Sequence, residues 1–141
     1  MRAYERLLKY VSVYTTSDPD SATVPSSMRQ YDLANILVDE LKALGLENVH
    51  VDENGVVYGW LSATAGCEQK PALGFIAHLD TSPDMSGHNV KPRIVSNYDG
   101  NDILLNEKEG IVLSPDQFPE LRNYPGHDLI VTDGNTLLGA D

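Results

Sequence analysis

Apolar residues recur every three or four positions near the start of the chain, which is the spacing of one face of a helix. The residues that share this face are Tyr4, Leu7, Leu8 and Val11. Residues 15–27 are rich in Ser, Thr, Asp and Pro, which are typical of loops. We therefore expect a first helix to end near Val13 and a loop to follow it.

A second helix is predicted after this loop. Its apolar face consists of Leu33, Ile36, Leu37, Leu41 and Leu44. Ser27 and Gln30 have the spacing of a capping box, in which each side chain bonds the backbone of the other residue. Gly45 can adopt the left-handed conformation that ends a helix. The helix is therefore expected to begin near Ser27 and to end at Gly45.

Two later stretches predict strands. Residues 49–61 contain two apolar runs around Asn54-Gly55, a pair that favours a tight hairpin turn. Residues 72–77 are continuously apolar, as in a strand that is covered on both faces inside an α/β sheet. We expect an α/β fold with this strand near the centre of the sheet.

The rest of the chain is dominated by turn-forming residues. Residues 81–124 are dense in Pro, Gly, Asn and Asp, with short apolar islands at 103–105 and 111–113. This pattern indicates small strands joined by loops. Regular structure is expected to return at 129–131 and 136–138, just before Asp141.

Composition limits the classes of partner. The 141 residues include 10 Lys and Arg against 21 Asp and Glu, a formal net charge of -11, which repels the phosphates of nucleic acids. No stretch has the length or continuity of a membrane span or of a signal peptide. Cys67 is the only cysteine, so no internal disulfide can form. We expect a cytoplasmic protein with no nucleic-acid or membrane partner.

The candidate chemistry follows the predicted central strand. Ligands in open α/β sheets gather beyond the carboxyl ends of strands, where His78-Leu79-Asp80 lies. Alternate side chains of an extended segment share a face, so His78 and Asp80 should project together. A His can ligate zinc, and a nearby carboxylate can orient its ring. Taken alone, however, His-x-Asp more often marks a structural His paired with a carboxylate.

Longer segments extend this pattern across the chain. They are Ser17-Asp18-Pro19, His78-Leu79-Asp80-Thr81-Ser82-Pro83-Asp84, Asn89-Val90-Lys91-Pro92 and Leu137-Leu138-Gly139-Ala140-Asp141. With them, the chain resembles the tripeptide aminopeptidases of the M20 metallopeptidase family. The resemblance implies a zinc-exopeptidase-like catalytic domain, in which helices flank a central mixed sheet. It also implies release of the N-terminal residue from tripeptides by a metal-activated water.

The resemblance carries three site residues onto this sequence. It implies that His78 ligates a zinc ion, that Asp80 is the catalytic carboxylate that orients His78, and that Asp141 bridges two Zn²⁺ ions. The family's general base and further ligands follow the position of Asp141, as does a domain that can form a homodimer. We therefore expect residues 1–141 to be the N-terminal part of the catalytic domain, and this chain alone to be inactive towards short peptides.

Other interpretations stay open at this stage. His50 and His88 are expected to be exposed and without a role in catalysis, and His127 to serve a turn. Another M20 activity, such as a dipeptidase, deacylase or carboxypeptidase, would use the same motif. A domain that binds a metal ion or a protein partner without catalysis is a further alternative.

Overall fold

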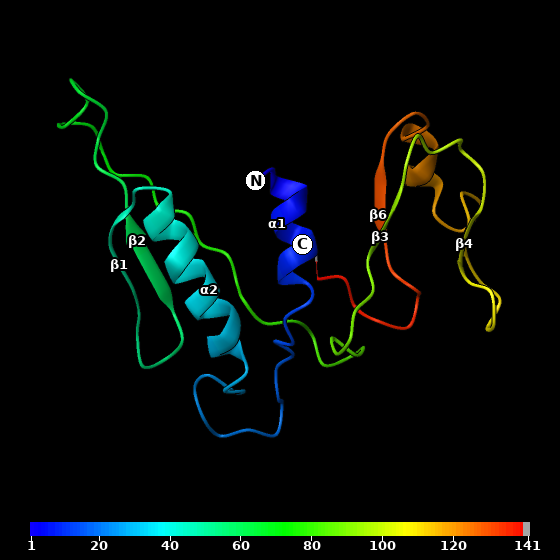
Figure 1. The fold of residues 1–141 in the computed structure, drawn as a ribbon, viewed down its shortest axis with the longest axis horizontal. Helices are drawn as coiled ribbons and strands as arrows, with labels where there is room; N and C mark the ends of the chain where they lie inside the picture. Colours follow the sequence, from blue (N-terminus) through cyan, green and yellow to red (C-terminus); the bar gives the residue numbers. More distant parts are fainter. Residues whose placement is uncertain (140–141) are drawn as a thin grey trace. The chain divides into compact units, whose positions relative to one another are not determined.

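The computed structural model describes residues 1–139. The chain divides into two compact units, one made of Thr15–Thr81 and the other of Met1–Tyr14 with the chain from Ser82 onward. Residues 1–139 form α-helices, a short 3-10 helix and several short strands along the chain (Figure 1). A mixed α/β architecture is therefore confirmed.

The first unit is built from a helix and a hairpin. Helix α2 (Gln30–Ala43) contacts both strands of the antiparallel pair β1 (Glu47–Val51) and β2 (Val57–Trp60). Its side chains Leu33 and Ala34 are buried. The predicted second helix and the predicted hairpin are both confirmed.

The two ends of α2 differ from each other in how well the sequence predicted them. At the end of the helix, Gly45 has a φ of 86°. The Gly45 N–H donates to the Lys42 carbonyl, and the Leu46 N–H donates to the Leu41 carbonyl. This is the predicted glycine cap, in its Schellman form. At the start, the predicted capping box of Ser27 and Gln30 is wrong. A turn, in which the Gln30 N–H bonds the Ser27 carbonyl at 3.1 Å, precedes the helix and makes Arg29 the N-cap.

Asp52 fixes the turn of the hairpin. Its carboxylate accepts hydrogen bonds from the backbone N–H groups of Asn54 at 3.0 Å and of Val56 at 2.9 Å. Gly55 supplies the positive φ of 79° that the turn requires. Hydrogen bonds to an ionised carboxylate stabilise its charged form, so the pKa of Asp52 lies below its ordinary value, chiefly because of Val56.

The second unit combines helix α1 (Ala3–Tyr10) with two separate strand pairs. Strand β3 (Arg93–Val95) pairs with β6 (Leu129–Val131), and β4 (Ile103–Asn106) pairs with β5 (Ile111–Leu113), both antiparallel. A 3-10 helix, η1 (Pro119–Asn123), lies between β5 and β6 in the chain. The predicted first helix, the apolar islands and the strand at 129–131 are confirmed.

Two predicted strands are wrong. Residues 72–77 form no strand, and Phe75 and Ile76 are 90% and 101% exposed. Residues 136–138 make only a single parallel bridge, from Thr136 to Ser86. A strand needs a hydrogen-bonded neighbour as well as an apolar sequence. Among residues 1–139, no segment pairs with residues 72–77, and the contact of Thr136 with Ser86 is not continued into a ladder. The sheets in this part of the chain are all two-stranded pairs, so it contains no central mixed sheet.

The helices are short. The longest in residues 1–139, α2, has 14 residues. Within residues 1–139, no helix combines the length and the apolar character that crossing a membrane requires.

Two isoleucines test the assignment of buried and exposed residues. Ile103 is 6% exposed, whereas Ile76 is 101% exposed. We expect Ile103→Ala to lower the free energy of unfolding by about 2–5 kcal/mol, because it leaves a cavity. The same change at Ile76 should alter it by less than about 0.5 kcal/mol. Urea denaturation followed by circular dichroism measures both, and similar losses in the two variants would contradict the exposed placement of Ile76.

The Asp52 turn should respond to acid. Because the folded state lowers the pKa of Asp52, its stabilising bonds are complete above the unfolded pKa of about 3.9 and are lost as the pH falls through the lower, folded value. The amide resonances of Asn54 and Val56 should therefore titrate together in NMR spectra, with a midpoint below about 3.9. Asp52→Asn should abolish this titration, and a midpoint at or above the ordinary value would contradict the turn geometry.

Candidate functional site

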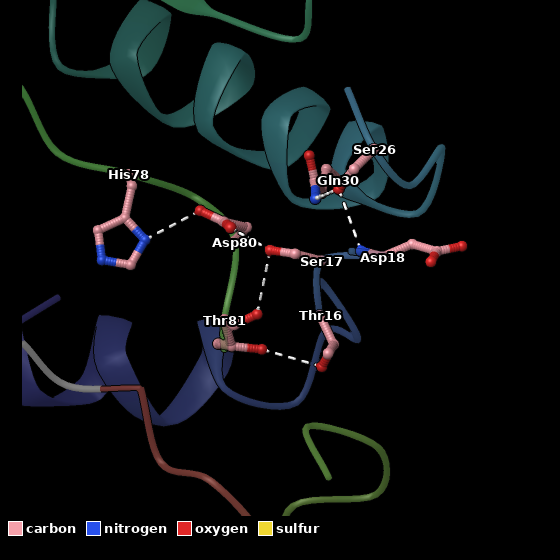
Figure 2. A network of polar contacts seen from close by, with 8 residues as sticks. All are labelled: Thr16, Ser17, Asp18, Ser26, Gln30, His78, Asp80 and Thr81. Carbon is pink, nitrogen blue, oxygen red and sulfur yellow. Dashed lines mark hydrogen bonds and ion pairs between the residues drawn. The ribbon is translucent and has the colours of Figure 1, made fainter. Parts of the chain in front are cut away.

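The candidate site is built on a short pairing between two segments of the first unit. Thr16 and Thr81 form an isolated parallel bridge, and the Ser17 N–H donates to the Thr81 carbonyl at 3.0 Å. The hydroxyl groups of Thr16 and Thr81 are hydrogen-bonded to each other at 3.0 Å. Thr15 and Thr16 are buried. The segment that follows His78 is therefore held against the loop at Ser17 (Figure 2).

His78 and Asp80 face each other, as their alternate positions in the sequence predict. His78 Nδ1 lies 3.0 Å from Asp80 Oδ1, and the side chains are 58% and 42% exposed. Leu79, between them, is only half-buried. An ionised carboxylate can only accept hydrogen bonds, so the Nδ1 atom carries the proton when this bond forms. The Nε2 atom then presents a lone pair, the form in which imidazole ligates metals.

The second oxygen of Asp80 is held by a residue from the distant loop. The Ser17 hydroxyl donates to Asp80 Oδ2, and its oxygen also lies 3.3 Å from the Thr81 carbonyl oxygen. The pKa of Asp80 is lowered, chiefly by the Ser17 hydrogen bond, while partial burial opposes the shift and His78 adds to it. Asp80 is thus held in its ionised form, with each carboxylate oxygen engaged (Figure 2).

The Ser17 loop is also tied to the region where α2 begins. The Asp18 N–H donates to the Ser26 hydroxyl at 3.1 Å, and the Gln30 side chain reaches the same hydroxyl at 3.5 Å. No spacing pattern identifies Ser17 as a site residue, because it lies 63 positions before Asp80 in the chain. Only the resemblance of Ser17-Asp18-Pro19 to the family drew attention to this loop.

The remaining histidines lie in the settings that the sequence predicted. His50 is exposed on β1 and stacks on Tyr58, and His88 is exposed in a loop with its ring edge against Tyr14. His127 lies in a turn, where its N–H bonds the Tyr124 carbonyl at 3.0 Å. Each is exposed.

A complete metal site is not assembled within the part of the chain that the structure describes. Residues 1–139 contain no group of three His, Cys, Asp or Glu side chains that could hold a metal ion. Asp141, the predicted bridging ligand, lies outside the described residues. Of the three predicted site residues, the structure thus brings together His78 and Asp80.

Comparison with known proteins identifies similar sequences. A protein named peptidase T from Geobacillus sp. (strain WCH70) is 59% identical over 137 residues, which is 97% of this chain and 33% of that protein. The peptidase T of Caldanaerobacter subterraneus subsp. tengcongensis is 58% identical over 140 residues, or 99% of this chain and 34% of its own. The chain thus resembles peptidase T over nearly its whole length. No family model matches the chain.

The matched region covers nearly all of this chain but only part of each relative. The peptidase T of Halothermothrix orenii likewise matches 99% of this chain but only 34% of its own length, at 56% identity. The chain therefore spans about a third of the length of the curated relatives that it matches. The name peptidase T describes these relatives as peptidases.

The pairing of Thr16 with Thr81 can be tested through its side chains. Thr81→Val keeps the shape of the residue but leaves the buried Thr16 hydroxyl without its partner at 3.0 Å. We expect the free energy of unfolding to fall by about 1–3 kcal/mol. Thr64→Val, in an exposed loop, is the matched control and should change it by less than about 0.5 kcal/mol. Equal effects in urea denaturation would show that the bridge does not hold the two segments together.

Proposed function

We propose that this chain supplies part of the active site of a zinc aminopeptidase of the peptidase T type, which releases the N-terminal residue from short peptides and from tripeptides in particular. The observation that carries the proposal is the hydrogen bond from His78 to Asp80, in a segment that resembles the family's motif. The similarity to proteins named peptidase T supports a peptidase. The restriction to tripeptides rests on the resemblance alone.

The residues in the described part of the site suit a zinc ion. Imidazole nitrogen is among the ligands that zinc prefers, and zinc-binding His residues usually donate their other ring N–H to a carboxylate or a carbonyl. His78 and Asp80 have this arrangement, at 3.0 Å. Their exposure of 58% and 42% gives an ion access from solvent.

Each residue then has a distinct proposed role. His78 would hold a zinc ion, Asp80 would fix the ring and its proton, and Asp141 would bridge two ions, as the resemblance implies. When bound, the zinc pair would polarise the scissile carbonyl and lower the pKa of a shared water. The net charge of -11 would favour the approach of the protonated amino terminus of a peptide.

The wider setting of the proposal also follows from the resemblance. We propose that residues 1–141 belong to the catalytic domain of a zinc-exopeptidase-like fold, and that a further domain mediates a homodimer. We also propose a cytoplasmic location, because the free, exposed thiol of Cys67 suits a reducing compartment.

An activity assay on the complete product of the encoding gene tests the proposal. We expect it to release the N-terminal residue from a free tripeptide, and a chelator to abolish the activity. His78→Ala should lower kcat/KM by more than about 100-fold, since loss of an outer-shell partner alone costs 10–100-fold. His50→Ala is the matched control, an exposed histidine on β1, and should retain wild-type activity.

Two results would contradict this function. Activity that survives both the chelator and His78→Ala would exclude zinc chemistry at this motif. Cleavage of an N-acylated amino acid in preference to the free tripeptide would favour a deacylase, because an aminopeptidase acts on a free amino terminus.

A further inference from the structure

Asp80 is held from two sides by segments that are far apart in the sequence. One carboxylate oxygen faces His78 Nδ1 at 3.0 Å, and the other accepts the hydrogen bond of the Ser17 hydroxyl. The bond between the carboxylate and Cβ turns easily, because torsions of this kind have broad energy wells. With only one oxygen engaged, Asp80 would be able to rotate away from the imidazole.

We propose that Ser17 is a positioning residue for the metal site. Its hydroxyl holds the Asp80 carboxylate in the orientation that accepts a hydrogen bond from His78 Nδ1, which keeps the proton on that nitrogen. Ser17 itself has no contact with His78 among the bonds described above; it acts through Asp80. The consequence for zinc rests on the proposed function, whereas the consequence for the His78 proton does not. Ser17 therefore determines which nitrogen of His78 carries the lone pair.

The backbone at Ser17 is held in place on both sides, which fixes the position of its hydroxyl. The Ser17 N–H is bonded to the Thr81 carbonyl at 3.0 Å, and the neighbouring Thr16 is buried and bridged to Thr81. On the other side, the Asp18 N–H is bonded to Ser26 at 3.1 Å. A donor held in this way can restrict Asp80, whereas a donor on a loosely held loop would follow the carboxylate.

A purely structural role for the Ser17 hydroxyl explains the contacts less well. Its alternative acceptor is the Thr81 carbonyl oxygen at 3.3 Å, and this oxygen already accepts the Ser17 N–H at 3.0 Å. Through this carbonyl alone, at 3.3 Å, the hydroxyl would add little to the pairing of the two segments. Asp80 is the nearer and the charged acceptor, and charge-assisted hydrogen bonds are the stronger ones.

The first test needs no metal. In the 141-residue chain, long-range ¹H–¹⁵N NMR should show a protonated Nδ1 and an unprotonated Nε2 for neutral His78. In Ser17→Ala, the two ¹⁵N shifts should move towards each other, because both tautomers become populated. Ser17→Thr, which keeps the hydroxyl, should restore the wild-type pattern. Ser21→Ala, the same change elsewhere in this loop, should leave it unaltered, since that hydroxyl contacts Thr23.

A double variant separates the proposed route from general loosening of the loop. In an Asp80→Asn background, Ser17→Ala should cause no further change in the His78 shifts, because Ser17 acts only through the carboxylate. If Ser17→Ala unfolds the first unit, as judged from the amide resonances of α2, then Ser17→Cys keeps a similar size with a much weaker donor and should give the same shift. Unchanged His78 shifts in a folded Ser17→Ala or Ser17→Cys variant would overturn the proposal.

Zinc titration of the complete product of the encoding gene distinguishes this proposal from the proposed function. We expect Ser17→Ala to weaken zinc binding at His78 by about 10–100-fold, as for other outer-shell partners, and Ser21→Ala to leave it unchanged. Binding that is lost in His78→Ala but unaltered in Ser17→Ala would overturn the role of Ser17 and leave the proposed function intact. Wild-type binding that is equal to that of His78→Ala would count against the proposed function, while the NMR result would still decide the role of Ser17.

Discussion

The pairing of Thr16 with Thr81 closes the first unit at its two ends. These residues are 65 positions apart, so bringing them together costs about 4 kcal/mol of chain entropy by the logarithmic scaling of loop closure. Three hydrogen bonds hold this junction. They join the Ser17 N–H to the Thr81 carbonyl, the Thr16 hydroxyl to the Thr81 hydroxyl, and the Ser17 hydroxyl to Asp80. At about 0.5–1.5 kcal/mol each, they are of the same order as the cost of closure. The geometry of Asp80 therefore depends on a junction with little stability to spare.

The elements that the sequence predicted correctly are those fixed by local rules. Helix α2 follows from apolar spacing and from Gly45, whose positive φ of 86° permits the cap. The hairpin β1–β2 follows from Asn54-Gly55. Each of these signals lies within a few residues of the structure that it specifies, so no knowledge of the rest of the chain is needed.

The prediction of a buried strand at 72–77 was wrong because its apolar run says nothing about a neighbour. Apolar side chains such as Phe75 and Ile76 favour burial, but whether they are buried depends on a second segment that pairs with the strand and packs against it. In the structure both side chains are exposed. The capping box failed for a related reason, since Ser27 and Gln30 have the right spacing but a turn moves the N-cap to Arg29.

The candidate site depends both on local sequence spacing and on contacts between segments that are far apart in the chain. The facing of His78 and Asp80 follows from their alternate positions, which an extended segment places on one side. An ionic attraction between these two groups exists only while His78 is protonated, and with side chains that are 58% and 42% exposed it is screened by water. Charge alone therefore cannot fix the ring. The direction of the Asp80 carboxylate has to come from hydrogen bonds, and the one at Oδ2 comes from Ser17, a residue that no local pattern in the sequence connects to the site.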